Sequence, residues 1–339
     1  MSQQAQLASL AVVVIGRNEG ERLTRCLESV GRMKQPFESV ETIYVDSNST
    51  DDSIARARRA GARVLVLPPG PTTAARGRNT GWHATRAAFI LFLDGDTVLH
   101  PDFVATALTQ FNDPQTAIVW GHRRELAANS SVYNRVLDLD WIYAPGVSQF
   151  CGGDALMRRD VLEEVGGYDE SLIAGEEPEM CRRMTGCGYR IMHIDFPMTT
   201  HDLAMTSFRQ YWKRAFRAGF AYASVSQRFR HSAHPLWRSE VRRNLLQGSL
   251  LLIVPPIAAL LSLRLRSGIP IAGVASFLVL LLFRTARRTA WKSPTEPFTI
   301  FLYGVHSHFQ QIPILFGQIK FYRQGKREHG LIEYKEVRR

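Results

Sequence analysis

The sequence contains few cysteines, and several common motifs are missing from it. Four cysteines in 339 residues show no disulfide framework and no zinc-ligand spacing, which is typical of reduced cytosolic thiols. The first sixteen residues carry no basic residue, and their apolar run is too short to cross a bilayer, so we expect no signal peptide there. Aromatic RNA-binding motifs are also missing, so we expect no nucleic-acid partner.

The composition is that of a globular protein with an acidic partner. Hydrophobic residues make up 45% and charged residues 22%, which excludes a disordered chain. The formal net charge is +11, and such a charge favours anionic lipid or a phosphorylated substrate once nucleic acid is set aside.

Strand-like and helix-like segments alternate over the first hundred residues. β-branched or continuous apolar runs predict strands at 11–15, 41–45, 63–67 and 89–93. Helical spacing of apolar residues predicts helices at 21–30, 54–60 and 80–88 between them. This alternation predicts an α/β fold with a doubly wound, mostly parallel sheet.

Polar residues follow three of these strands. Asn18 and Glu19 follow the first, Asp46 ends the second, and Asp94 and Asp96 end the fourth. Ligands of open α/β sheets bind beyond the carboxyl ends of the strands, so we expect these side chains to share one crevice. Two carboxylates one residue apart suit Mg²⁺ or Mn²⁺. An Asp-Gly-Asp turn without a metal is the alternative that the residues alone leave open.

Several stretches together resemble one known family. They are VVVIGRNEGERL, YVDSNSTDDS, AARGRNTGW, FILFLDGDTVLHPDF and CGGDALMRRDVLEEVGGYDESLIAGEEPEMCRRMTGCGYRI. In order and spacing they resemble a family 2 glycosyltransferase of the GT-A fold, of the membrane-associated type that makes polysaccharides or glycolipids. The resemblance covers roughly residues 8–220. It implies a hexosyltransferase-type enzyme that uses a nucleotide diphosphate sugar and a divalent metal, Mg²⁺ or Mn²⁺, with inversion.

The resemblance also implies roles for individual residues. The metal ligands would be Asp96, Asp94 and His201. The nucleotide sugar would contact Asn18, Glu19, Asp46, Arg78, Asn79, Asp94 and Asp154. A UDP-sugar is expected over a GDP-sugar, although the base stays open between uracil and guanine because Ser47 stands where many relatives carry a second acid.

The catalytic base is expected in the acidic run after Gly175. The family usually has Glu-Asp there, with the Asp as general base, and Glu177 aligns with that Asp. Glu176 is the neighbouring candidate. An acidic helix N-terminus, stabilised by the helix dipole, is the non-catalytic interpretation of the same residues.

Beyond the predicted GT-A catalytic domain (1–205) the composition changes. Residues 206–243 are aromatic and basic and predict amphipathic interfacial helices. Residues 244–284 hold two apolar runs, which predict a membrane-embedded helical hairpin. Residues 285–339 predict an amphipathic basic tail, with Lys326 and Arg327 near anionic lipid. Arginines on both flanks of the hairpin predict a cytoplasmic catalytic domain on the inner membrane.

The function that we expect from the sequence is sugar transfer to a lipid-linked or membrane-proximal glycan acceptor. A nucleotidyltransferase is one alternative, but it commonly opens with a Gly-rich loop that Val14–Glu19 matches poorly. A catalytically inactive membrane scaffold is the other, and the intact carboxylates argue against it. A re-entrant hairpin, or a buried hairpin in a soluble domain, are the alternatives to two membrane spans.

Overall fold

The computed structural model describes residues 9–324, which form two compact units. The first unit contains the residues up to Leu126 together with Tyr143–Leu203. The second contains Ala127–Ile142 and the described residues from Ala204 onward. The end of the predicted basic tail, with Lys326 and Arg327, lies outside the described residues.

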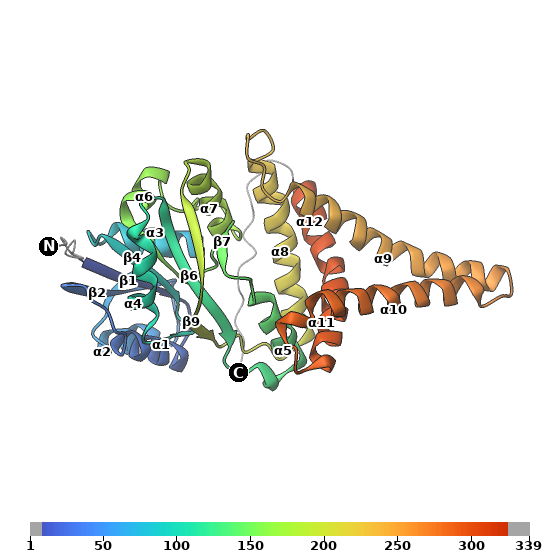
Figure 1. Cartoon of the computed structure of the whole chain (residues 1–339), viewed down its shortest axis with the longest axis horizontal. Coiled ribbons are helices and arrows are strands. Elements are labelled where there is room, and N and C mark those ends of the chain that lie inside the picture. Colours follow the sequence, from blue (N-terminus) through green and yellow to red (C-terminus); the bar gives the residue numbers. More distant parts are fainter. Residues whose placement is uncertain (1–8, 325–339) are drawn as a thin grey trace. The chain divides into compact units, whose positions relative to one another are not determined.

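The first unit is built on a mixed β-sheet (Figure 1). Its strands are β1 (Ser9–Gly16), β2 (Ser39–Asp46), β3 (Arg63–Val66), β4 (Phe89–Asp94), β5 (Thr97–Leu99), β6 (Thr116–Glu125), β7 (Gly146–Ser148), β8 (Ala155–Arg158) and β9 (Arg190–His201). They are ordered β3-β2-β1-β4-β8-β6-β9-β5, and β7 pairs with β9. The first four strands in that order are parallel, which confirms the predicted α/β sheet where the site is expected. Beyond them β8 runs antiparallel to both β4 and β6.

Helices cover both faces of this sheet. They are α1 (Glu21–Gly31), α2 (Ser53–Arg59), α3 (Ala74–His83), α4 (Phe103–Leu108), α6 (Arg159–Val165) and α7 (Glu176–Gly186), with the 3₁₀ turn η1 (Thr109–Asn112). Helices α1 and α2 lie on one face, and α3, α6 and α7 lie on the other (Figure 1). Strands β1 and β4 are buried on both faces, as their continuous apolar runs predict.

The helix before β4 begins earlier than the sequence predicts. The spacing of apolar residues predicts a helix at 80–88, whereas α3 spans Ala74–His83. Thr73 caps its start by accepting a hydrogen bond from the Arg76 N–H, and the helix ends before Thr85, whose hydroxyl accepts from the Ala87 N–H. Arg78 and Asn79 therefore lie within a helix and not in the loop before one.

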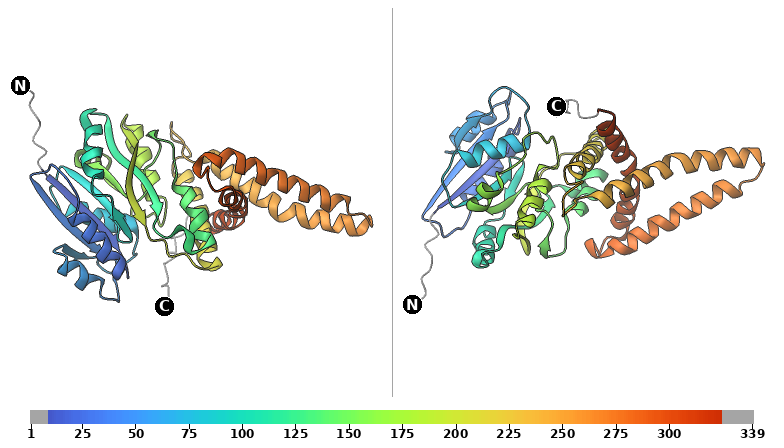
Figure 2. Two further views of the ribbon diagram at one scale, coloured as in Figure 1. Left: turned by 60° about the horizontal axis from the view of Figure 1, so that its bottom comes forward. Right: turned by 90° about the horizontal axis from the view of Figure 1, so that it is seen from above.

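The second unit is helical. It contains η2 (Ala128–Ser130), α5 (Val132–Asp138), η3 (Leu139–Trp141), α8 (Phe208–Arg228), α9 (Arg238–Arg264), α10 (Ile269–Thr289), η4 (Ala290–Lys292), α11 (Pro297–Phe309) and α12 (Gln311–Gln324). Helices α9 and α10 form a long antiparallel hairpin (Figure 2). Within the predicted amphipathic tail, the described residues form two helices, α11 and α12.

Helices α8 and α12 approach each other through glycines. A Cβ added to Gly317 would lie 2.0 Å from the Phe216 carbonyl oxygen, and one added to Gly219 would lie 2.0 Å from the Ile314 carbonyl oxygen. The two backbones therefore touch, which no larger residue permits at either position.

The Gly317→Ala variant is expected to be less stable by about 1–3 kcal/mol, because the helices must separate to admit the methyl group. Thermal unfolding of the purified protein in detergent measures the change. Gly273→Ala is the matched control: it lies on α10 with nothing within 4 Å of the added Cβ, so its stability should stay equal or rise slightly. Equal melting temperatures for the two variants would contradict the close packing.

Candidate active site

Three parallel strands end side by side at the edge where the sequence predicts the site. Gly16 of β1 pairs with Asp46 of β2, and Ile15 of β1 pairs with Asp94 of β4. The loops after these strands therefore meet at one edge of the sheet, beyond the carboxyl ends of the strands.

Asn18 and Asp46 bind the loop after β2. The buried carboxylate of Asp46 accepts hydrogen bonds from the Tyr44 hydroxyl (3.0 Å) and the Ser49 N–H (2.7 Å). The Asn18 side-chain oxygen accepts from the Thr50 N–H (2.7 Å), and the Asn18 N–H donates to the Ser49 hydroxyl (2.9 Å). Asn18 has a φ of 56°, in the left-handed region that asparagine tolerates. The two loops thus form one polar rim.

Asp94, Asp96 and His201 form a group that can hold a metal ion. Each offers one ligand atom, and these atoms lie within 4.8 Å of one another. His201 ends β9, and its Nε2 lies 3.3 Å from Asp96 Oδ1. Two carboxylates and an imidazole suit Mn²⁺ and also bind Mg²⁺ through oxygen. The residues present therefore fit a divalent ion.

The charges around this group also favour a cation. Burial, together with the nearby carboxylates of Glu19 and Asp94, raises the pKa of Asp96 well above its usual value. Against the effect of burial, the guanidinium groups of Arg78 and Arg123 lower the pKa of Asp94. Asp94 is thus held ionised. The ionised form of Asp96 is disfavoured, and a bound cation would stabilise it.

Arg78 links the strand end to helix α7. It is buried and donates to Asp94 Oδ1 and to Glu176 Oε1, each at 2.8 Å. Asn79 points elsewhere: its amide nitrogen donates to the Tyr168 carbonyl (2.8 Å), and its oxygen accepts from the Tyr168 N–H (3.0 Å). It also donates to the Glu170 carboxylate (3.0 Å), so Asn79 holds the loop before α7 and is not one of the groups bonded to Asp94 or Asp96.

Asp154, the residue before the neighbouring strand β8, supports Asp94. Its Oδ1 accepts the Asp94 N–H at 2.9 Å, and its Oδ2 lies 2.6 Å from the Arg123 guanidinium. Gly153 brings the backbone against the same group, because a Cβ there would lie 2.6 Å from Asp94 Oδ2 and 2.8 Å from Arg78 Nη2. A side chain at position 153 would displace the carboxylate that the arginines hold.

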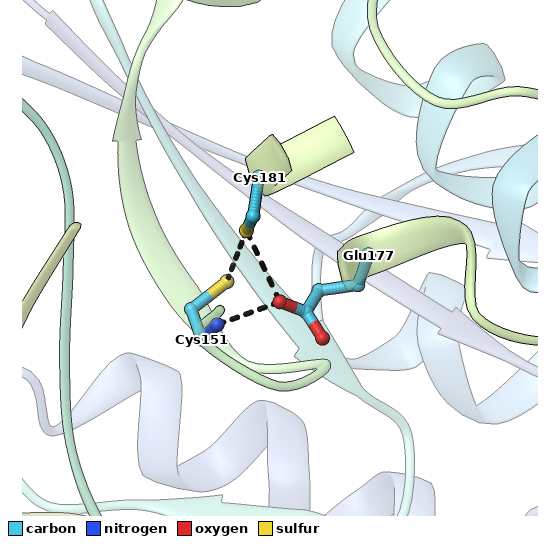
Figure 3. Close-up of side chains that lie close together, drawn as sticks. All are labelled: Cys151, Glu177 and Cys181. Atoms are coloured by element: carbon cyan, nitrogen blue, oxygen red, sulfur yellow. Dashed lines mark hydrogen bonds between the residues drawn. The ribbon is translucent and has the colours of Figure 1, made fainter. Parts of the chain in front are cut away.

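Glu176 and Glu177 have different partners although they are adjacent at the start of α7. Glu176 is paired with Arg78. Glu177 is buried, and its Oε1 accepts hydrogen bonds from the Cys151 N–H (2.6 Å) and the Cys181 thiol (3.1 Å) (Figure 3). Within the described part of the chain Glu177 has no ion pair with a cation, and burial raises its pKa. A carboxylate with a raised pKa is suited to accept a proton near neutral pH.

Two protein-family patterns match this chain and identify its family. The sequence pattern of glycosyl transferase family group 2 matches residues 89–291, more than half of the chain. The pattern of glycosyl transferase family 2 matches residues 11–166, which include β1, β2 and β4. The chain is a family 2 glycosyltransferase.

Individual relatives agree with this assignment. The glycosyltransferase is 23% identical to glycosyltransferase AglE of Haloferax volcanii, over 63% of its own chain and 72% of AglE. It is 27% identical to the pre-mycofactocin glycosyltransferase of Mycobacterium tuberculosis, over 67% of its own chain but only 49% of that protein. It thus spans about half the length of this second relative.

A solved structure shows the same fold. The mannosyltransferase PcManGT of Pyrobaculum calidifontis, solved with GDP-Man and Mn²⁺, superposes with a TM-score of 0.66 at 18% sequence identity. The match covers 94% of this glycosyltransferase and 88% of PcManGT. This likeness confirms the predicted GT-A fold. The family match confirms the predicted glycosyltransferase class, and the nucleotidyltransferase alternative falls away.

The structure brings most of the predicted site residues of this glycosyltransferase to one edge, but it adds two arginines. Arg22 of α1 lies 2.7 Å from Glu19 and 4.0 Å from Asp96, and Arg123 of β6 pairs with Asp154. Arg22 lies in the stretch VVVIGRNEGERL, which carries the family resemblance, whereas Arg123 lies in none of those stretches. Arg123 is far in sequence from the carboxylates that it contacts, so no local signal in the sequence identifies it.

Proposed function

We propose that this glycosyltransferase transfers a sugar from a nucleotide diphosphate sugar, with inversion, to a lipid-linked or membrane-proximal glycan acceptor at the cytoplasmic face of the membrane. One observation carries the proposal: Asp94, Asp96 and His201 converge beyond the carboxyl ends of the strands, where open α/β sheets bind their ligands.

Asp94, Asp96 and His201 would hold a divalent ion, Mg²⁺ or Mn²⁺. When bound, such an ion stabilises as a Lewis acid the negative charge that develops on the departing diphosphate. The mannosyltransferase of the same fold was solved with Mn²⁺, which supports this assignment. Arg78 and Arg123 keep Asp94 ionised, and Arg78 also holds the carboxylate of Glu176. We assign Arg78 to the donor site through this effect on Asp94.

Glu177 is the general base in this proposal. Its Oε2 extends away from the two thiols (Figure 3) and would take the proton of the acceptor hydroxyl. The acceptor oxygen then bonds to the sugar carbon while the bond to the diphosphate oxygen breaks, and the nucleoside diphosphate leaves. A single displacement of this kind inverts the sugar carbon. Glu176 is the weaker candidate because Arg78 already neutralises it.

Asn18, Glu19 and Asp46 would form the nucleoside side of the donor site through the polar rim. The sequence favours UDP, whereas the mannosyltransferase of the same fold was solved with GDP-Man. A panel of UDP- and GDP-sugars, tested by the shift each causes in the melting temperature, separates the two. A ligand at 100 times its Kd stabilises a one-site protein by about 2.7 kcal/mol, so the correct base gives a measurable shift. Nucleoside diphosphate release with the same donor then tests the transfer itself.

The hairpin of α9 and α10 supports attachment to the membrane. Both helices are long and apolar enough to cross a bilayer. Large apolar side chains are exposed along both, among them Leu246, Ile253, Leu260, Phe277 and Leu280. Soluble proteins rarely expose so large an apolar surface. Pro255 and Pro256 lie inside α9, and membrane helices tolerate such prolines.

Two membrane spans predict a specific labelling result. Ser267→Cys, in the loop between α9 and α10, should react with an impermeant thiol reagent only from the outer face of the membrane. The exposed native thiol of Cys187 in the catalytic unit is the internal control and should react only from the cytoplasmic face. High salt should not extract the protein, because salt screens surface charge but does not weaken apolar burial. Release by salt alone, or labelling of Ser267→Cys only from the cytoplasm, would contradict two spans.

A further inference from the structure

The two hydrogen bonds to Glu177 Oε1 come from different parts of the first unit, and the neighbouring Gly152 backbone also favours the ionised carboxylate. Cys181 lies one turn further along α7, so its thiol meets the carboxylate from the same helix. Cys151 lies in the loop before β8 and donates its backbone N–H (Figure 3). Both cysteines are buried, and their sulfur atoms are 3.7 Å apart.

We propose that Cys181, with the backbone of Cys151, is a positioning residue for Glu177: the two donors hold Oε1 and thereby orient Oε2 toward the acceptor hydroxyl. This inference rests on the proposed role of Glu177 as general base. It assigns a function to a thiol that touches neither substrate nor cofactor.

The chemistry of a buried thiol suits this task. Burial raises the pKa of Cys181 well above its ordinary value and that of Cys151 to about 11, so both stay protonated at neutral pH. The Cys181 S–H can therefore donate to the carboxylate, whereas a thiolate would repel it. A thiol is also a weak donor. It orients the carboxylate without lowering its basicity as strongly as a paired arginine would.

The other ionisable groups near Glu177 do not neutralise its carboxylate. Tyr168 lies in the loop before α7, and the Arg78 guanidinium lies over its ring, 5.5 Å from the ring centroid. On α7 itself, Glu176 is paired with Arg78 and Glu179 with Arg183. No cation of the described chain is thus paired with Glu177, and the thiol donor is what distinguishes its environment.

A thiophilic metal is the competing use of the same three side chains. Cys151, Glu177 and Cys181 each offer one ligand atom within 4.8 Å of the others. Against this, the Cys151 N–H already occupies Glu177 Oε1, and the group supplies three ligands where a structural zinc site uses four. The hydrogen-bonded arrangement therefore explains the contacts better.

The test compares Cys181→Ala with Cys181→Ser in the full-length protein. Alanine removes the donor, whereas serine keeps a hydroxyl that can donate to Oε1. We measure the pH profile of kcat for nucleoside diphosphate release. The acidic limb of Cys181→Ala should move to higher pH by roughly 0.5–1 unit, the effect of losing one hydrogen bond to the ionised carboxylate. Cys181→Ser should stay close to the wild type, and the donor KM should not change in either variant.

Cys187→Ala is the matched control, because this exposed thiol caps the same helix away from Glu177. Its profile should match the wild type. If Cys181→Ala melts below the assay temperature, Cys181→Val fills the space without donating and replaces it. If Cys181→Ala or Cys181→Val is folded and active and its pH profile of kcat does not shift, Cys181 only fills space and the proposal is wrong. Stoichiometric cobalt(II) binding, with a thiolate absorption band that Cys181→Ser loses, would assign the three residues to a metal and overturn the proposal. A wild type without any sugar-dependent release would instead refute the proposed function.

Discussion

Replacing Glu177 by glutamine is expected to lower kcat by about 10²–10⁴-fold, the usual contribution of a general base. The glutamine side-chain oxygen can accept the same bonds from the Cys151 N–H and the Cys181 thiol, so the loop before β8 should keep its place. What the amide cannot do is take the proton of the acceptor hydroxyl. Donor affinity should therefore survive while turnover falls, and steady-state kinetics with a separate donor-binding titration measures both.

The Glu176→Gln variant is the comparison that decides between the two glutamates. It weakens the ion pair with Arg78, which also holds Asp94, so its main effect should be on donor affinity. If Glu176→Gln shows the loss of kcat at unchanged donor affinity and Glu177→Gln keeps its turnover, the base lies one residue earlier than we place it.

The Asp96→Ala variant is expected to lose transfer by about 10³-fold or more. A metal ion acting as a Lewis acid contributes several kcal/mol of stabilisation to the developing charge, and each 1.36 kcal/mol corresponds to a factor of ten in rate. The fold should survive, because Asp96 lies in the turn after β4 and contributes no apolar surface to the core. Nucleoside diphosphate release measures the loss, and the melting temperature reports on folding.

Asp102→Ala is the matched control for Asp96. Asp102 is a surface aspartate whose partner is Lys34, so its loss should change activity by less than twofold. Donor turnover that persists in Asp96→Ala with a chelator present would remove Asp96 from the metal site.

The sequence predicts well the part of the site that lies at the ends of the parallel strands. Strands with continuous apolar runs must be buried in a parallel sheet, and parallel neighbours bring their carboxyl ends to one edge. The positions of Asp46 and Asp94 follow from that rule alone. The start of α3 does not, because it depends on the Thr73 cap in a stretch that reads as a loop.

The part of the site around Glu176, Glu177 and Arg123 depends on contacts between residues far apart in the chain. Glu176 and Glu177 are adjacent and chemically alike, and only the packing of α7 turns one toward Arg78 and the other toward Cys151. Arg123 joins the site because β6 lies beside β8, a pairing that no local pattern indicates. In the second unit, composition alone predicts the two membrane spans. The contacts of Gly219 and Gly317 between α8 and α12 cannot be predicted from the sequence, because they depend on how the two helices pack.

The most direct test of the account follows nucleoside diphosphate release by the purified wild-type protein from a panel of nucleotide sugars, first with a chelator and then with Mg²⁺ or Mn²⁺ restored. We expect release with one class of donor, dependent on an acceptor, abolished by the chelator and restored by the metal. Equal release with and without a divalent ion would contradict the role given to Asp94, Asp96 and His201.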